Sequence, residues 1–331
     1  MYKYISCLVF ICHLFIAQAQ GDKINGVSIV SMRNTHESIH FEPIKRINAN
    51  WVTVMPFAFI RNNAPNVYYN ANFQWKGETE LAITESIKHA HANHLKVMIK
   101  PHVWTHGGWI GDLTFNTEED WLKFEKSYTS YILSFAKIAA AQNVAIFCVG
   151  VEIKKSVVQR PKFWINLIKE VRKVYKGKLT YAANWDNYEN VSFWKMLDFI
   201  GIDAYFPLTE AKTPSFQNCF IGWEKHYKFI KEISKKVNKP VLFTEFGYRN
   251  IDYTGKEPWD EKQNNTFNSL GQENAFLAVF AKFWGESWFA GGFIWKWFPD
   301  HAESGGTANN RFTPQNKAVE KIIASFYGKF M

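Results

Sequence analysis

The sequence has few cysteines and, beyond its first twenty residues, no apolar run long enough to predict a membrane span. Only 4 of its 331 residues are cysteine, and Cys7 and Cys12 lie close to the N-terminus. Cys148 falls in a strand-like run and Cys219 in a predicted loop, so nothing indicates a disulfide between them. Stability is therefore expected to come from the core, which 47% hydrophobic residues can supply.

Signature motifs of several protein classes are also missing. No Walker loop, no Gly-x-Gly-x-x-Gly after a strand and no nucleophile-elbow serine is present. His102 and His106 lie in a loop-like segment that does not place them on one face, so we expect no metal site and no cofactor. The formal charge is +9, but the lysines are scattered over predicted helix faces, which indicates a solvated basic surface rather than a nucleic-acid partner.

The N-terminus has the pattern of a secretory signal. Lys3 precedes a mostly apolar run from Ile5 to Ala17, and the segment closes on Ala17-Gln18-Ala19. We therefore predict a signal peptide over residues 1–19, cleavage near Ala19, and export to the periplasm, the cell surface or the medium. Neither Cys7 nor Cys12 has the small-residue context of a lipoprotein cleavage site, so no lipid anchor is expected.

The remaining residues, 20–331, alternate between strand-like and helix-like segments. We predict eight strands, at Ile24–Ser31, Trp51–Pro56, Lys96–Pro101, Val144–Glu152, Lys178–Asn184, Phe199–Tyr205, Pro240–Glu245 and Ala290–Trp297. We predict helices at Glu78–Asn93, Thr117–Gln142, Pro161–Tyr175, Val191–Met196, Trp223–Val237, Gly271–Trp284 and Gln315–Tyr327. This rhythm, with no internal repeat and no low-complexity linker, predicts one domain with the α/β TIM (β/α)8 barrel fold.

Two glutamates end strand-like runs in opposite halves of the chain. Glu152 closes the fourth predicted strand and Glu245 the seventh, so both are expected at the mouth of the barrel. A carboxylate at the end of a buried strand is costly to desolvate, which favours a catalytic role over a structural ion pair. Cleavage of a glycosidic bond by retention needs two such carboxyl groups, about 5–5.5 Å apart.

Strand alternation predicts what else faces the mouth. If Glu152 points inward, Cys148 and Gly150 should point inward below it. The same rule pairs other residues on one face of their strands: Lys100 with His102, Asp203 with Tyr205, and Trp295 with Trp297. Aromatic residues make up 17% of the chain, with 14 Trp, and such rings are apolar platforms for sugars, so the inventory favours a saccharide ligand.

Three motifs stand out at the ends of predicted strands: Val149-Gly150-Val151-Glu152, Thr244-Glu245-Phe246-Gly247-Tyr248 and Gly291-Gly292-Phe293-Ile294-Trp295-Lys296-Trp297. They resemble glycoside hydrolase family 113, a family of clan A, the retaining glycosidases on TIM barrels. The resemblance implies β-1,4-mannan or manno-oligosaccharide hydrolysis, with Glu152 as acid/base and Glu245 as nucleophile. Many clan A enzymes carry Asn directly before the acid/base, whereas here Val151 stands there, and Asn184 is a candidate for the missing contact with the sugar 2-hydroxyl.

Further residues are expected around this pair. Tyr205, Arg249 or Lys100 could keep the pKa of Glu245 low. The predicted substrate contacts are Lys100, His102, Trp104, Asn184, Trp185, Tyr205, Tyr248 and Trp295, with Trp295 as the platform beneath the sugar. For His102 and Asn184 a structural role is an equal alternative, and for Asp203 pairing with Lys100 is favoured. The segment 250–270 is expected to form a rim or lid.

Two alternatives to mannan hydrolysis remain open. One is a retaining glycosidase for another β-glycan, either a glucan or an amino-sugar polymer. The other is a carbohydrate-binding barrel without turnover, which the presence of both glutamates disfavours. The expected partner is an oligosaccharide or polysaccharide, and the chain is expected to be a monomer.

Overall fold

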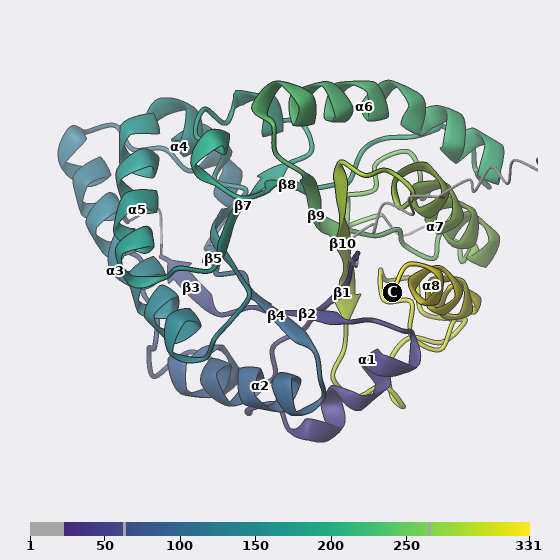
Figure 1. The fold of residues 1–331 in the computed structure, drawn as a ribbon, viewed down its shortest axis with the longest axis horizontal. Coiled ribbons are helices and arrows are strands. Elements are labelled where there is room, and N and C mark those ends of the chain that lie inside the picture. The colour runs from purple at the N-terminus through teal and green to yellow at the C-terminus, as the bar shows by residue number, and fades with distance from the viewer. Residues whose placement is uncertain (1–22, 62–63, 264–265) are drawn as a thin grey trace, which may run out of the picture.

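The computed structural model describes residues 23–61, 64–263 and 266–331, and the predicted signal peptide lies outside them. Eight parallel strands close into a barrel in the order β1, β10, β9, β8, β7, β6, β4 and β2 (Figure 1), as the sequence predicts. These barrel strands are β1 (Ile24–Ile29), β2 (Trp51–Val54), β4 (Lys96–Ile99), β6 (Ile146–Val151), β7 (Lys178–Asn184), β8 (Ile200–Asp203), β9 (Val241–Phe246) and β10 (Phe289–Trp297). The fold is therefore a TIM barrel.

Helices surround the barrel on its outside (Figure 1). They are α1 (Glu42–Arg46), α2 (Glu80–Ala92), α3 (Glu118–Ala141), α4 (Lys154–Gln159), α5 (Pro161–Val174), α6 (Phe216–Val237), α7 (Ser269–Phe283) and α8 (Ala318–Lys329). Short 3₁₀ turns lie at Ser38–His40, Lys76–Glu78, Ile110–Asp112, Tyr188–Asn190 and Trp194–Met196. The helix predicted over 191–196 is wrong, because only Trp194–Met196 form a 3₁₀ turn. The adjacent Phe193 and Trp194 are both buried, and the Trp194 indole donates a hydrogen bond to Tyr188 O.

Helix α6 begins earlier than the sequence predicts. Ser215 caps it, accepting a hydrogen bond from the Asn218 backbone, and the Asn218 side chain accepts one from the Ser215 backbone in return. Cys219 therefore lies in a helix and not in a loop. Both Cys148 and Cys219 are buried and free.

The core is divided into a layer outside the barrel and a smaller cluster within it. The outer layer packs the helices onto the strands, and Trp164, Trp223 and Trp284 are fully buried there. A separate cluster joins one residue from each of six barrel strands, which is expected only inside a barrel: Ile24, Trp51, Met98, Ile146, Leu242 and Phe293. Apolar side chains thus fill the barrel below the polar groups of its mouth.

Two irregularities in strand register overturn predicted side-chain directions. The β6–β7 ladder shifts between Cys148 and Val151, so Val151 joins Cys148 in an interior cluster. Gly150 instead faces outward, where an added Cβ would lie 2.7 Å from the Tyr128 hydroxyl. A bulge is an extra residue that reverses the alternation beyond it, and no local sequence pattern marked this one.

The second irregularity separates Trp295 from Trp297. The pairing of β10 with β1 is regular from Ile24, which lies opposite Gly291. The register then shifts by one residue, so that Ile29 lies opposite Trp297. Trp297 therefore joins the outer core with no exposed surface, whereas Trp295 stays half-buried at the mouth. The prediction that the two indoles share a face is wrong for this reason.

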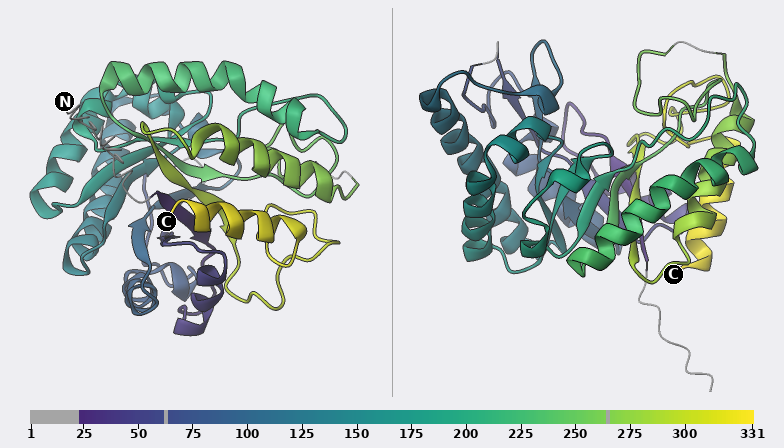
Figure 2. Two further views of the ribbon diagram at one scale, coloured as in Figure 1. Left: turned by 45° about the vertical axis from the view of Figure 1, so that its right-hand side comes forward. Right: turned by 90° about the horizontal axis from the view of Figure 1, so that it is seen from above.

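The second and third predicted strands continue beyond the barrel as a small parallel sheet. It consists of β3 (Phe57–Ile60) and β5 (His102–Thr105), which follow β2 and β4 after short breaks. This sheet rises on one side of the barrel, and the loops after β9 and β10 rise on the other (Figure 2, right). The mouth lies between these two raised parts of the chain.

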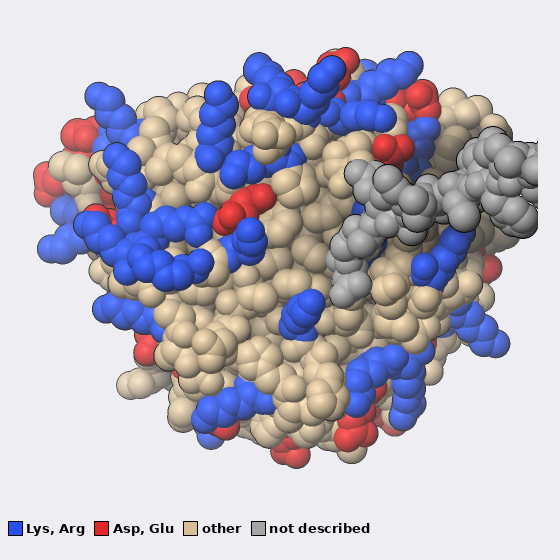
Figure 3. Space-filling model, in the orientation of Figure 1, with Lys and Arg blue, Asp and Glu red and all other residues tan. Residues whose placement is uncertain are grey.

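Charges on the face shown in Figure 3 are spread widely. Lys and Arg side chains occupy its rim with Asp and Glu among them, and its centre is mainly uncharged. Among the described residues, no helix is long and apolar enough to cross a membrane.

Candidate active site

Glu245 lies near the end of β9 and is almost completely buried, with 8% of its side chain exposed. The Lys100 ammonium donates to Oε1, and the Tyr205 hydroxyl donates to Oε2 at 2.7 Å. Burial and the neighbouring Glu245 charge raise the pKa of Tyr205 well above its usual value, so the phenol keeps its proton and remains a donor. Both carboxylate oxygens of Glu245 are thus held in place.

Lys100, at the end of β4, is the cation at the centre of this cluster. Its Nζ lies 3.0 Å from Asp203 Oδ1, which also accepts a hydrogen bond of 2.7 Å from the Thr244 hydroxyl. Burial alone would favour the neutral amine, but the charges of Asp203 and Glu245 outweigh it and raise the pKa of Lys100. Asp203 therefore pairs with Lys100, in the structural role favoured for it.

Glu152 follows β6 and has different surroundings. Its backbone adopts the left-handed conformation with φ of 52°, and its amide donates to Ala182 O at 2.8 Å. Its Oε2 accepts one hydrogen bond, 3.0 Å long, from the Trp109 indole. Trp109 belongs to the loop after β5 and was not predicted, although an indole in the loop run Gly107-Gly108-Trp109 is a signal of a cleft residue.

The pKa values of both carboxyl groups are raised above the usual range. Burial, the Asp203 charge and the Glu245 charge raise the pKa of Glu152 to about 8, against the weaker effect of the Trp109 indole. Burial and Asp203 raise the pKa of Glu245 to about 7, while Lys100 and Tyr205 oppose that rise. The expectation of a low pKa at Glu245 is therefore wrong, because burial beside Asp203 outweighs two donors. A cation and a phenol donate to Glu245 whereas only the Trp109 indole donates to Glu152, so Glu152 is the carboxyl group that keeps its proton to the higher pH.

Arg249 does not reach Glu245, contrary to one of the predictions. Its guanidinium donates to the backbone carbonyls of Asn310, Asp260 and Gln263, at 3.0, 3.1 and 2.8 Å. These bonds connect the loop after β9 to the loop after β10. Arg249 has a scaffolding role beside the site.

An aromatic wall forms the side of the mouth next to Glu245. The His102 ring stacks between Trp295, at 5.9 Å between centroids, and Phe57, at 5.1 Å. His102 Nε2 lies 3.9 Å from Glu245 Oε1. Burial, followed by the charges of Lys100 and Lys296, lowers the pKa of His102 well below its usual value, so the ring is neutral. The half-buried Trp295 ring also has the Lys296 ammonium 5.1 Å from its centroid.

The other predicted site residues differ in their exposure, and all but one are at least partly accessible. Trp104 is 53% exposed on β5, and Trp185 stacks on Trp259 of the loop after β9 at 4.9 Å. Asn184, at the end of β7, pairs with Asp203 in the barrel ladder and is half-buried. Tyr248 is the exception: it is only 1% exposed and packs against Phe276 of α7, so it is a core residue and not part of the cleft wall.

Among the described residues, no group of three His, Cys, Asp or Glu side chains is arranged to hold a metal ion. The mouth instead combines two titrating carboxyl groups, a fixed cation and aromatic rings. On a TIM barrel, this arrangement is typical of a glycoside hydrolase.

The model of the family described as Glycoside Hydrolase Family 113 matches residues 31–317. The chain belongs to glycoside hydrolase family 113. No curated protein sequence matches it.

Solved structures agree with the fold. The GH113 β-mannanase AaManA from Alicyclobacillus acidocaldarius, in complex with ManMIm, is similar with a TM-score of 0.82 and 23% identity, over 94% of this chain and 98% of that chain. A second GH113 β-1,4-mannanase gives a TM-score of 0.80 and 25% identity, over 93% and 99%. The β-D-glucuronidase of Dictyoglomus thermophilum gives 0.62 and 13% identity, over 94% of this chain but 51% of that one.

Proposed function

We propose that this protein is a retaining β-mannanase that cleaves β-1,4-mannan or manno-oligosaccharides by double displacement. The observation that carries the proposal is the unequal surroundings of its two glutamates. Glu245 is fixed by a cation and a phenol, whereas Glu152 has one neutral donor and the higher pKa. The names of the similar GH113 β-mannanases support mannan as the substrate.

In the first step, a Glu245 oxygen attacks the anomeric carbon and forms a glycosyl ester. Glu152 gives its proton to the departing glycosidic oxygen, so the leaving sugar departs as an alcohol. Esterification removes the negative charge of Glu245, and the pKa of Glu152 then falls. Trp295 supports the face of the sugar, and the neutral His102 holds the indole from its other side.

In the second step, Glu152 acts as a base. It takes a proton from a water molecule whose oxygen attacks the anomeric carbon, and the bond to Glu245 breaks. Glu245 leaves as a carboxylate, which Lys100 and Tyr205 stabilise again. Two displacements at one carbon return the original anomeric configuration.

Product analysis on mannohexaose, cellohexaose and chitosan oligomers tests the proposal, with Glu245→Gln as the blank. We expect cleavage of mannohexaose, absent from the variant, and product sizes will distinguish endo from exo action. Cleavage of another oligomer alone would overturn the choice of sugar. Binding without cleavage would identify a carbohydrate-binding barrel.

Export is a separate part of the proposal. It rests on Lys3, the apolar run from Ile5 to Ala17 and the Ala-x-Ala end at Ala19. N-terminal sequencing of the mature protein checks it, and we expect the first residue to be Gln20. An N-terminus that still begins at Met1 would contradict the export.

A further inference from the structure

The loops after β9 and β10 enclose a cavity of about 480 Å³ beside the mouth. Its lining includes four cations, Arg249, Lys262, Lys296 and Arg311, and one carboxylate, Glu261. Such a concentration of one charge in a concave site attracts an anion.

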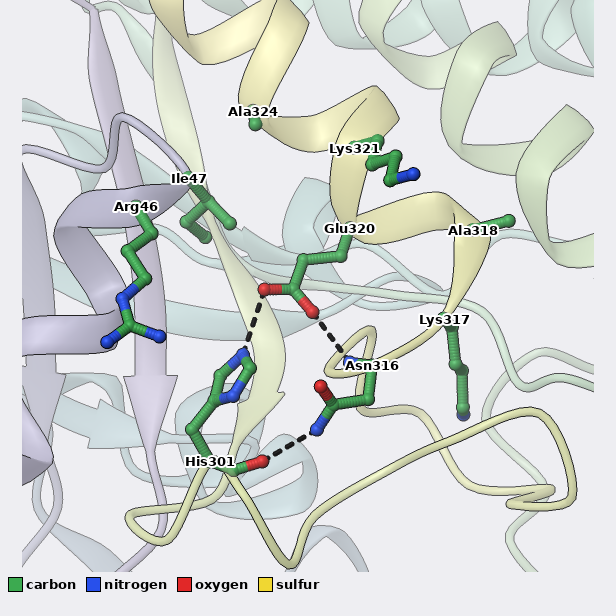
Figure 4. Close-up of a pocket in the computed structure, with 9 residues that line it drawn as sticks. All are labelled: Arg46, Ile47, His301, Asn316, Lys317, Ala318, Glu320, Lys321 and Ala324. Carbon is green, nitrogen blue, oxygen red and sulfur yellow. Dashed lines mark hydrogen bonds and ion pairs between the residues drawn. The ribbon is translucent and has the colours of Figure 1, made fainter.

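A cavity of similar size elsewhere in the molecule has a smaller excess of positive charge, with three cations and one carboxylate in its lining. It measures about 470 Å³ and lies between α1 and α8 (Figure 4). Its cations are Arg46, Lys317 and Lys321, and the Lys317 ammonium donates to Arg311 O at 2.9 Å. Its one carboxylate, Glu320, lies 2.9 Å from the His301 imidazole and accepts from the Asn316 amide at 2.6 Å. The cavity beside the mouth is therefore the better candidate for a ligand.

The walls of this basic cavity are held by hydrogen bonds. Arg249 is 6% exposed and its three bonds to backbone carbonyls join both loops. Asn250, the next residue, donates to Thr307 O at 3.0 Å and Asn309 O at 3.2 Å. The cavity is thus a built feature of the mouth.

Two lining residues connect the cavity to the catalytic groups. Lys296 follows Trp295 in β10, lies over its ring, and is close enough to His102 for its charge to lower the pKa of that imidazole. Phe312 is buried with its ring 5.8 Å from that of Tyr205, the donor to Glu245. A sugar lying on Trp295 would therefore have the cavity beside it.

The positive charges that line the cavity are not fully neutralised by neighbouring carboxylates. Lys296 pairs with Glu261 at 3.6 Å, and that carboxylate is 60% exposed. Within the described part of the chain, neither the Lys262 ammonium nor the Arg311 guanidinium lies within ion-pair distance of a carboxylate. An Arg guanidinium binds carboxylate and sulfate through paired hydrogen bonds, and a Lys adds a point charge.

We propose that this cavity binds an acidic substituent, a carboxylate or a sulfate ester, on a sugar next to the cleaved bond. Lys296, Lys262 and Arg311 make the contacts, and Arg249 positions the two loops. The inference rests on the proposed function, and it narrows the substrate class from neutral mannan to a β-mannan that carries acidic groups.

The test compares three oligosaccharides: neutral β-1,4-mannohexaose, the same oligomer with C6 carboxylates, and the same oligomer with 6-O-sulfates. We expect a higher kcat/KM on at least one acidic oligomer than on the neutral one, and the two acidic arms identify the group. In Lys296→Gln/Arg311→Gln, the acidic-to-neutral ratio should fall about tenfold. Lys321→Gln removes one charge in the cavity of Figure 4 and should leave the ratio unchanged.

A binding measurement keeps this test separate from the proposed function. The Glu245→Gln variant retains the cavity, and calorimetry should show tighter binding of the acidic oligomer, weakened by salt. Cleavage of the neutral oligomer with equal kcat/KM on all three would overturn the inference and leave the mannanase proposal standing. No cleavage of any oligomer, with salt-sensitive binding of the acidic one, would overturn the mannanase proposal and support the cavity.

Discussion

The two glutamates at the mouth of the barrel, Glu245 and Glu152, have different surroundings. Glu245 is enclosed by the charged cluster of Lys100 and Asp203 and accepts two strong hydrogen bonds. Glu152, which directly follows β6, is half-buried and accepts one hydrogen bond from the Trp109 indole. Both oxygens of Glu245 are therefore held by a cation and a phenol, whereas only one neutral donor contacts Glu152.

Both residues are glutamates, so their different proposed roles must come from the neighbours that each carboxyl group has in the fold. Lys100 is fully buried and joins Asp203 to Glu245, so the charge on one side of the mouth is built into the barrel itself. Glu152 interacts with this cluster electrostatically, since the charges of Asp203 and Glu245 raise its pKa. Changes to either side should have separable effects.

Removal of the Glu245 carboxylate should have the largest effect. We expect Glu245→Ala to lower kcat by roughly 10⁴-fold or more, because both displacements use this group. Added azide should restore activity on an aryl β-mannoside by attacking in its place, and the product should then be the α-mannosyl azide. A β-mannosyl azide would contradict the role of Glu245.

Removal of the Glu152 carboxyl group should depend on the leaving group. For Glu152→Gln we expect kcat/KM on mannohexaose to fall by roughly 10²–10⁴-fold, because an alkoxide needs a proton to leave. On a 2,4-dinitrophenyl β-mannoside, whose leaving group needs no proton, kcat/KM should change much less. Equal losses on both substrates would contradict an acid/base role.

The pH profile of kcat/KM should be bell-shaped. Below about pH 7, Glu245 is protonated and cannot attack, and above about pH 8, Glu152 has lost the proton that the leaving oxygen needs. We therefore expect an optimum between these values. In Glu152→Gln with the dinitrophenyl substrate, the alkaline limb should disappear and the acid limb should remain.

Lys100→Met tests the charged side of the comparison. Loss of the ammonium should raise the pKa of Glu245 further and move the acid limb upward by about 1 pH unit. Because Asp203 and Glu245 would lose their buried partner, the free energy of unfolding should fall by about 3–5 kcal/mol in urea titration. Lys321→Met, which removes an exposed charge, should change neither quantity.

Trp109→Phe should have the smallest effect. The indole stabilises the ionised form of Glu152, so its loss should move the alkaline limb upward by about 0.5 to 1 pH unit. The acid limb should stay in place because Trp109 does not contact Glu245. Movement of both limbs together would show that the two sides of the mouth are not independent.

Much of this site could be predicted from the sequence. The eight strands are marked by apolar runs, and the polar residues that end them, Lys100, Tyr205, Glu152 and Glu245, gather at the mouth because the strands are parallel. The pairing of Asp203 with Lys100 was expected because both residues end predicted strands, and the structure confirms it. Local patterns were sufficient to place these residues at the ends of their strands.

The errors occurred where the geometry depends on contacts distant in sequence. The bulges that turn Gly150 and Trp297 outward leave no local periodicity. The hydrogen bond between Trp109 and Glu152 joins residues 43 positions apart in the chain. Arg249 donates to backbone carbonyls of two loops and does not contact Glu245. The burial that raises the pKa of Glu245 is likewise a property of the closed barrel.

Trapping of the covalent intermediate tests the division of roles most directly. A 2-deoxy-2-fluoro-β-mannosyl fluoride should inactivate the enzyme, because the fluorine slows release of the ester more than its formation. After proteolysis, mass spectrometry should find one added fluoromannosyl group on the peptide that contains Glu245. A label on the Glu152 peptide, or turnover with inversion and no label, would contradict the account.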